Sequence, residues 1–115
     1  HKHEIFGNFA IGMDETKNFV FFHKLANDEV IEQSVDLGEI QSCKVINTSR
    51  MLKSRDGGSQ KVIDRLQLSF IPLTKTKPGI KMEFFNSEVS IRLNGELQLI
   101  EKWSKLINDH LNHMK

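Results

Sequence analysis

The longest regular pattern of hydrophobic positions lies at the C-terminal end of the chain, over residues 94–115. Apolar side chains recur there at steps of three and four residues, the period of a helix with one apolar stripe. The stripe consists of Leu99, Ile100, Trp103, Leu106, Ile107, Leu111 and Met114. Asn94 is a suitable N-cap, and Glu96 suits the positive end of the helix dipole. Because such a stripe must be buried, the pattern predicts a helix that covers a sheet.

The preceding part of the chain alternates apolar and polar residues with the period of two that is typical of β-strands. The segments with this pattern are residues 4–13, 18–23, 30–35, 40–47, 65–70 and 80–84. The alternation is clearest at Leu66, Leu68 and Phe70, which are separated by polar residues. Gly7 and Gly12 lie inside the first segment, where they predict a bulge or strong coiling of a single strand.

Turn-forming residues separate these segments. The polar residues 14–17 predict a hairpin between the first two strands, and Pro72 followed by residues 74–79 predicts a turn before the last one. The Asp-Gly dipeptide at 56–57 favours a tight turn. The surrounding residues 49–60 fit either the tip of a long hairpin or a mobile loop, and we expect a mobile tip.

Together these patterns predict a single domain over residues 1–115, mainly β with one C-terminal α-helix that covers a curled sheet. A chain of 115 residues is long enough to bury a core but too short for a catalytic and a regulatory domain. Residues 86–93 fit a strand or a connecting loop equally well. Six and seven strands therefore both remain open.

Charge and cysteine content narrow the setting. The formal net charge is +1, so no overall field attracts nucleic acid or an anionic bilayer, and we expect no nucleic-acid partner. Cys43 is the only cysteine, which rules out an internal disulfide and favours a reducing, cytoplasmic compartment. The chain shows no membrane-spanning run and begins at His1 rather than Met. We therefore expect a fragment of a longer protein, in which a segment outside this sequence tethers the domain to the inner membrane.

Motifs of known catalytic sites are missing from the sequence, including Gly-rich phosphate loops and the Gly-x-Ser-x-Gly turn. Cys43 could serve as a nucleophile with a histidine such as His23 as its base. The apolar alternation around Cys43 instead predicts a buried thiol that packs as a small hydrophobic group. We expect a protein that is not an enzyme and has no cofactor.

Histidines near the two ends of the chain could approach one another. His110 and His113 are spaced to share one side of the last helical turns, and His1 and His3 could join them if the termini met. No cluster of cysteine or carboxylate completes such a set, and histidine near a helix C-terminus also suits the dipole. We expect no metal site.

Basic residues gather around two predicted loops. The first group flanks the Asp-Gly-Gly tip and the second flanks the Pro-Gly turn, and the members are Arg50, Lys53, Arg55 and Lys61, followed by Lys75, Lys77 and Lys81. If the two loops lay together, these side chains would form a rim that binds phosphates or anionic lipid headgroups. Solvated loop charge is the simpler interpretation of the same residues.

The general plan resembles the bacterial pleckstrin-homology-like (PH-like, GRAM-like) domains of uncharacterised function. The resemblance rests on residues 18–22 (NFVFF), 35–40 (VDLGEI) and 96–103 (ELQLIEKW), the last of which ends at Trp103. It implies a bent, partly open barrel of two packed antiparallel sheets capped by the helix, and a binding role. Lipid-binding members of this family carry a basic loop between their first two strands, whereas residues 14–17 are mostly acidic here. No lipid-site residue is therefore carried over.

The leading hypothesis is a non-enzymatic module that docks a protein or peptide partner at the inner membrane surface. A peptide could add to an exposed sheet edge beside the helix, or a partner could sit on loops at the open end. The alternative is peripheral binding to anionic lipid headgroups through the two basic loops. An enzyme that uses Cys43 or His23 is the third and weakest interpretation.

Overall fold

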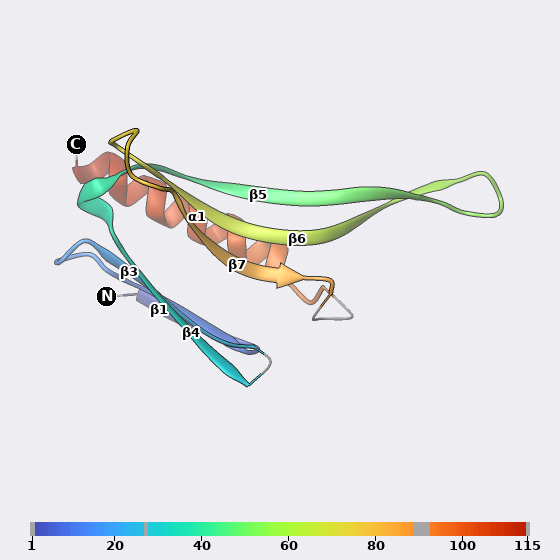
Figure 1. Cartoon of the computed structure of the whole chain (residues 1–115), viewed down its shortest axis with the longest axis horizontal. Helices are drawn as coiled ribbons and strands as arrows, with labels where there is room; N and C mark the ends of the chain where they lie inside the picture. Colours follow the sequence, from blue (N-terminus) through green and yellow to red (C-terminus); the bar gives the residue numbers. More distant parts are fainter. Residues whose placement is uncertain (1, 27, 89–92, 115) are drawn as a thin grey trace.

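The computed structural model describes residues 2–26, 28–88 and 93–114, which form two antiparallel sheets and one helix (Figure 1). The elements are β1 (Lys2–Phe6), β2 (Phe9–Asp14), β3 (Phe19–Ala26), β4 (Glu29–Asp36), the 3₁₀ helix η1 (Leu37–Glu39), β5 (Ile40–Lys53), β6 (Ser59–Pro72), β7 (Ile80–Asn86) and α1 (Glu96–Met114). The predicted class, mainly β with one C-terminal helix, is confirmed. Seven strands occur in the described residues, and the alternation predicted at Val89 and Ile91 lies outside them.

The first sheet has the order β1-β2-β3-β4. The prediction of a single strand over residues 4–13 is wrong, because the chain reverses at Gly7 and Asn8 and pairs Phe6 with Phe9. Gly7 has φ of 57°, a conformation that glycine adopts without steric cost, so it makes a turn rather than a bulge. The predicted hairpin between β2 and β3 is confirmed, with Asp14 paired to Phe19 across its end.

The second sheet has the order β5-β6-β7 and contains an unusually long hairpin. The expectation of a mobile tip over residues 49–60 is wrong. Paired strands continue to Lys53 and resume at Ser59, and Ser54 closes the tip by donating its N–H to the carbonyl of Gly58 at 2.8 Å. β6 pairs with β7 only over Arg65–Phe70, so residues 48–64 project as a two-stranded ribbon, which we call the arm (Figure 1).

The helix packs its apolar stripe against both sheets. Leu99, Ile100, Trp103, Ile107 and Leu111 are buried and belong to one core cluster with residues of β2 to β7. The predicted Asn94 cap is wrong, because Gly95 supplies the carbonyl that accepts the first helical bond, from the N–H of Leu99 at 3.1 Å. The N–H of Asn94 is held instead by the Glu96 carboxylate at 2.7 Å.

The two sheets are linked by side chains where a closed barrel would have a hydrogen-bonded ladder. Lys24 of β3 is buried and donates from Nζ to the backbone carbonyl of Glu83 on β7 at 3.1 Å. Gln33 of β4 donates from Nε2 to the carbonyl of Lys81 at 3.0 Å. The sheets are therefore not closed into a full barrel, which agrees with the predicted partly open arrangement.

Candidate functional site

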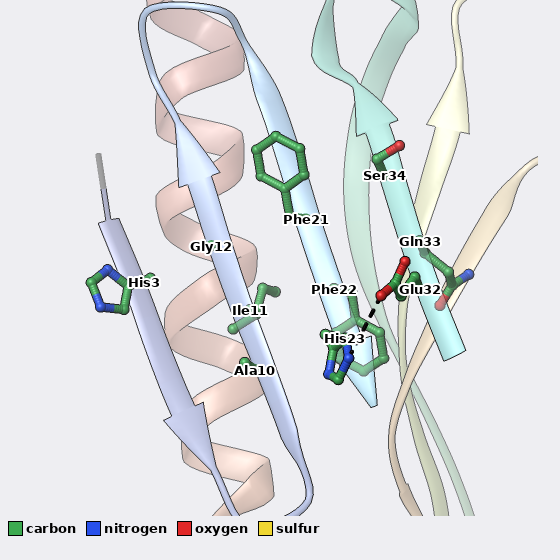
Figure 2. A pocket seen from close by; sticks show the side chains of 10 residues that line it. All are labelled: His3, Ala10, Ile11, Gly12, Phe21, Phe22, His23, Glu32, Gln33 and Ser34. Atoms are coloured by element: carbon green, nitrogen blue, oxygen red, sulfur yellow. Dashed lines mark ion pairs between the residues drawn. The ribbon is translucent and has the colours of Figure 1, made fainter. Parts of the chain in front are cut away.

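The four-stranded sheet has an outer face that points away from the core. Along β3 the buried residues Val20, Phe22 and Lys24 alternate with Phe21, His23 and Leu25, which face outward because successive side chains of a strand point to opposite sides. The outer face carries a shallow hollow of about 630 Å³ (Figure 2). Residues from β1 to β4 line it, so the hollow extends across the sheet.

The middle of the hollow is low because two small residues of β2 lie there. Gly12 pairs with His3 of β1 and with Phe21 of β3, and Ala10 pairs with His23. A Cβ added at Gly12 would lie 3.3 Å from both the Cβ of His3 and the carbonyl of Lys2, a tight contact that would require β1 to shift by a few tenths of an ångström. Figure 2 shows the larger side chains rising on both sides of this strip.

Large apolar side chains stand exposed on this face. Leu25 and Val30 are direct cross-strand neighbours and are 53% and 56% exposed, and Phe21 is 46% exposed. Ile5 on β1 is exposed as well. The His23–Glu32 pair lies between Phe21 and the Leu25–Val30 pair, so the face combines exposed apolar side chains with a polar centre. We call the set Ile5, Phe21, Leu25 and Val30, together with the hollow that Phe21 lines, the docking face.

The border of the docking face is acidic along β4. Glu32 follows Val30 two residues later on the same side of the sheet, whereas Glu29, which pairs with Ala26, points to the other side. Glu32 lies 3.7 Å from Nε2 of His23 (Figure 2). Residues 28–39 contain five acidic residues and no lysine or arginine. A partner of this face therefore meets apolar surface beside negative charge.

A second candidate surface is the outer edge of β5, where the sequence predicted that a peptide could add beside the helix. Among the described residues no strand pairs with β5 on this side. However, the Asn108 carboxamide of α1 occupies the edge at Cys43. It accepts from the Cys43 N–H at 2.9 Å and donates to the Cys43 carbonyl at 2.7 Å, as a neighbouring strand would. Strand addition next to the helix is blocked at this position.

The candidate catalytic residues are separated and differ in exposure. Cys43 is buried, and this burial raises the pKa of its thiol to about 12 despite an opposing hydrogen bond with Ser104. At neutral pH almost none of it is the nucleophilic thiolate. His23 projects from the outer face of the other sheet, opposite to the core. The two residues are not brought together.

The candidate metal ligands are engaged differently. The His110 ring lies with Nε2 2.7 Å from Oδ1 of Asn18, an amide rather than a ligand cluster. His1 lies outside the described residues. Within residues 2–26, 28–88 and 93–114, no group of three or more histidine, cysteine or carboxylate side chains could hold a metal ion. In the same part of the chain no helix has the length and apolarity to span a membrane.

The structure divides the seven basic candidates into two groups. Arg50, Lys53, Arg55 and Lys61 belong to the arm, and Lys75, Lys77 and Lys81 belong to the turn before β7 and its start. The two groups lie at opposite ends of β6, whose 14 residues span about 45 Å. They therefore do not form one rim. Arg50 is paired with Asp64 at 3.0 Å and Lys77 with Glu39 at 2.8 Å, whereas Lys53, Arg55 and Lys61 are exposed in the arm.

Sequence reasoning missed the docking face. The run Phe19 to Phe22 is apolar on both sides of the strand, so it suggested core without showing which residues faced outward. The available signal was the pair Ala10 and Gly12 on the preceding strand. Small residues alternating with the large Phe9, Ile11 and Met13 indicate a face that the core does not fill.

Comparison with known proteins found no matching protein-family model, no matching curated protein and no matching solved structure. The functional argument therefore rests on the surfaces described above.

Proposed function

We propose that the chain is a non-enzymatic docking module that binds a protein partner on the outer face of its four-stranded sheet. The observation that carries this proposal is the exposure of Phe21, which lines the hollow floored by Gly12, and of Leu25 and Val30 farther along the same face. Burial of such side chains yields about 25 cal/mol per Å² of apolar surface, which favours association over continued exposure to water. The location, a cytoplasmic setting at the inner membrane surface, remains part of the proposal.

We also propose membership in the PH-like superfamily. Three features support it: a sheet of four strands followed by a sheet of three, an open gap between them, and a C-terminal helix whose Trp103 is buried. In that family the barrel is a scaffold for binding. The resemblance therefore agrees with a docking role, and the docking face supplies a specific surface for it.

The chemistry of the docking face defines its partner. An apolar anchor side chain fits in the hollow beside Phe21, and the carboxylate of Glu32, which lines the same hollow, favours lysine or arginine next to that anchor. The expected ligand is a segment with one or two large apolar residues flanked by basic ones. Acidic segments are disfavoured because they would place like charges together.

Peptides selected from a random phage-displayed library against the chain are expected to carry this pattern and to require the docking face. The double variant Phe21→Thr/Val30→Thr keeps β-forming residues but removes the apolar anchors, so peptide affinity should fall at least about tenfold. Biolayer interferometry with synthetic peptides measures the change. The matched control is Leu73→Thr, an exposed leucine outside this sheet, which should bind normally.

Two results would contradict the proposal. One is a selection that yields no binding peptide. The other is a set of peptides whose affinity is the same for the double variant and the unaltered chain. Circular dichroism of the variant separates loss of the surface from loss of the fold.

A second candidate function is peripheral attachment of the arm to anionic membranes. The observation that favours it is the exposure of Met51 and Leu52 directly beside Lys53, with Lys61 opposite Met51. Apolar side chains that insert between headgroups, flanked by cations, are typical of surfaces that bind anionic lipid. The arm alone would supply this contact, because the basic turn before β7 lies at the other end of β6.

Co-sedimentation with phosphatidylserine vesicles tests this second candidate. Binding should weaken as salt is raised, since the Debye length shortens, and should be lost in Lys53→Glu/Lys61→Glu. The control Lys75→Glu/Lys81→Glu changes the same charge at the other end of β6 and should bind as the unaltered chain does. Equal retention on neutral phosphatidylcholine vesicles would refute a charge-driven attachment.

A further inference from the structure

Positive and negative side chains are segregated along the molecule. The arm, residues 48–64, contains four basic residues and two acidic ones, whereas residues 28–39 contain five acidic residues and no lysine or arginine. Both arm carboxylates are engaged locally, since Asp64 pairs with Arg50 and Asp56 accepts a hydrogen bond from the hydroxyl of Ser54. The arm therefore presents an excess of positive charge, and the border of the docking face presents negative charge.

One side of the arm has the pattern expected for a ligand of the docking face. Met51 lies directly opposite Lys61, and Lys53 follows two residues later on the same side of the ribbon. All three are exposed, and Met51 is 60% exposed. The result is a flexible apolar side chain between two lysines. Methionine also packs favourably against aromatic rings such as that of Phe21.

We propose that the arm of one copy of this chain docks on the docking face of a second copy. Met51 enters the hollow beside Phe21, and Lys53 and Lys61 lie next to the Glu32 carboxylate of the other molecule. This inference rests on the proposed docking function and names its partner. One chain carries two surfaces with exposed apolar side chains, and the charged residues beside them have opposite signs. Docking between two copies would cover both surfaces.

The arm cannot cover the docking face of its own molecule. It extends about 20 Å beyond the last pairing between β6 and β7, given six residues at 3.3 Å each. It points away from the four-stranded sheet along the 53 Å long axis (Figure 1). Each molecule therefore offers one arm and one docking face to its neighbours. Contacts of this kind either close into a ring or reciprocal pair, or continue as a chain of molecules.

A charge-swap experiment tests the proposal by sedimentation velocity over about a hundredfold range of protein concentration. The arm variant is Lys53→Glu/Lys61→Glu, and the face variant is Glu32→Lys. The unaltered chain should self-associate in low salt and dissociate in high salt. Each variant alone should associate at least about tenfold more weakly, because its arm and its face then carry the same sign.

Mixing the two variants is the decisive step. The acidic arm of the first then complements the basic face of the second, and the unaltered arm and face of each complement one another, so association should return. The control Lys75→Glu/Lys105→Glu has the same net charge as the arm variant but should associate normally. These exposed positions lie outside the proposed contact, and circular dichroism confirms that each variant is folded.

Three results would overturn the inference. The first is a chain that stays monomeric at every concentration, the second is a mixture that fails to associate, and the third is association that the arm and face variants leave unchanged. If library peptides still require Phe21 and Val30 while the chain is monomeric, the docking function stands and only self-docking is refuted. Salt-sensitive binding of the monomeric chain to phosphatidylserine vesicles would instead assign the arm to a membrane.

Discussion

Replacing Trp103 with alanine is expected to lower the free energy of unfolding by about 3–5 kcal/mol. Trp103 is 1% exposed and is among the largest fully buried side chains of the molecule. Its loss removes a large apolar contact and leaves a cavity between the helix and the sheets. Domains of this size have a total stability of about 5–15 kcal/mol, so the variant should unfold at a much lower urea concentration.

The indole also makes a polar contact that can be separated from its volume. Nε1 donates to the Glu4 carboxylate at 3.1 Å, and Lys102 forms an ion pair with the same carboxylate. Trp103→Phe keeps most of the ring but removes this donor, so it should cost less, about 1–2 kcal/mol.

Urea unfolding followed by far-UV circular dichroism measures both Trp103 variants, since neither retains a tryptophan. The control Met114→Ala, at an exposed position near the end of the same helix, should cost under about 1 kcal/mol. A Trp103→Ala variant as stable as the control would show that the helix does not hold β1 and the core together.

The parts of the fold that were predicted correctly have one face directed at the core. Leu66, Leu68 and Phe70 alternate with polar residues, and all three are fully buried as that pattern indicates. The helix was predicted for the same reason, because its stripe has a period that only one structure satisfies. Where one face of a strand or helix is buried and the other is exposed, the spacing of its hydrophobic residues predicts the element.

The arm was not predicted because no core selects its pattern. Met51 and Leu52 are adjacent, and in a ribbon exposed on both sides they face opposite directions. Isolated two-stranded hairpins are marginally stable, so local sequence favoured a mobile tip. In the structure the β5–β6 pairing continues outward from the three-stranded sheet, and the Ser54–Gly58 hydrogen bond closes its end. The sheet therefore orders a hairpin that the local sequence alone does not predict.

Lys24 shows a second limit of sequence patterns. It occupies an inward position of β3 and is buried, although a charged residue there argues against a core-facing strand. Its partner is Glu83, 59 residues later, which lies 3.4 Å away through its carboxylate. Such compensation depends on tertiary contact and has no local signal. The docking face differs, because Ala10 and Gly12 mark it in the sequence, but which side chains of the four strands share it depends on strand pairing.

The second large expected effect on stability concerns Asn108, the residue of α1 that bonds the edge of β5 at Cys43. Asn108→Ala should lower the free energy of unfolding by about 1–3 kcal/mol, because it leaves the Cys43 N–H without its partner and leaves the Cys43 carbonyl with only the Ser104 hydroxyl, at 3.5 Å, in a partly buried position. The same change should greatly accelerate hydrogen exchange of the Cys43 amide, measured by NMR. The matched control is Asn112→Ala, the same substitution at an exposed position one turn later, which leaves both quantities nearly unchanged.

Asn108→Asp separates the two bonds of this contact. A carboxylate still accepts from the Cys43 N–H, but it cannot donate to the Cys43 carbonyl and instead places negative charge beside it. Stability should therefore fall while the Cys43 amide stays protected. Loss of protection in both variants to the same degree would mean that the helix end has detached, rather than that one hydrogen bond was removed. Selective loss in Asn108→Ala would establish that a helix side chain takes the place of a neighbouring strand. It would also explain why partner binding is expected on the docking face instead of this edge.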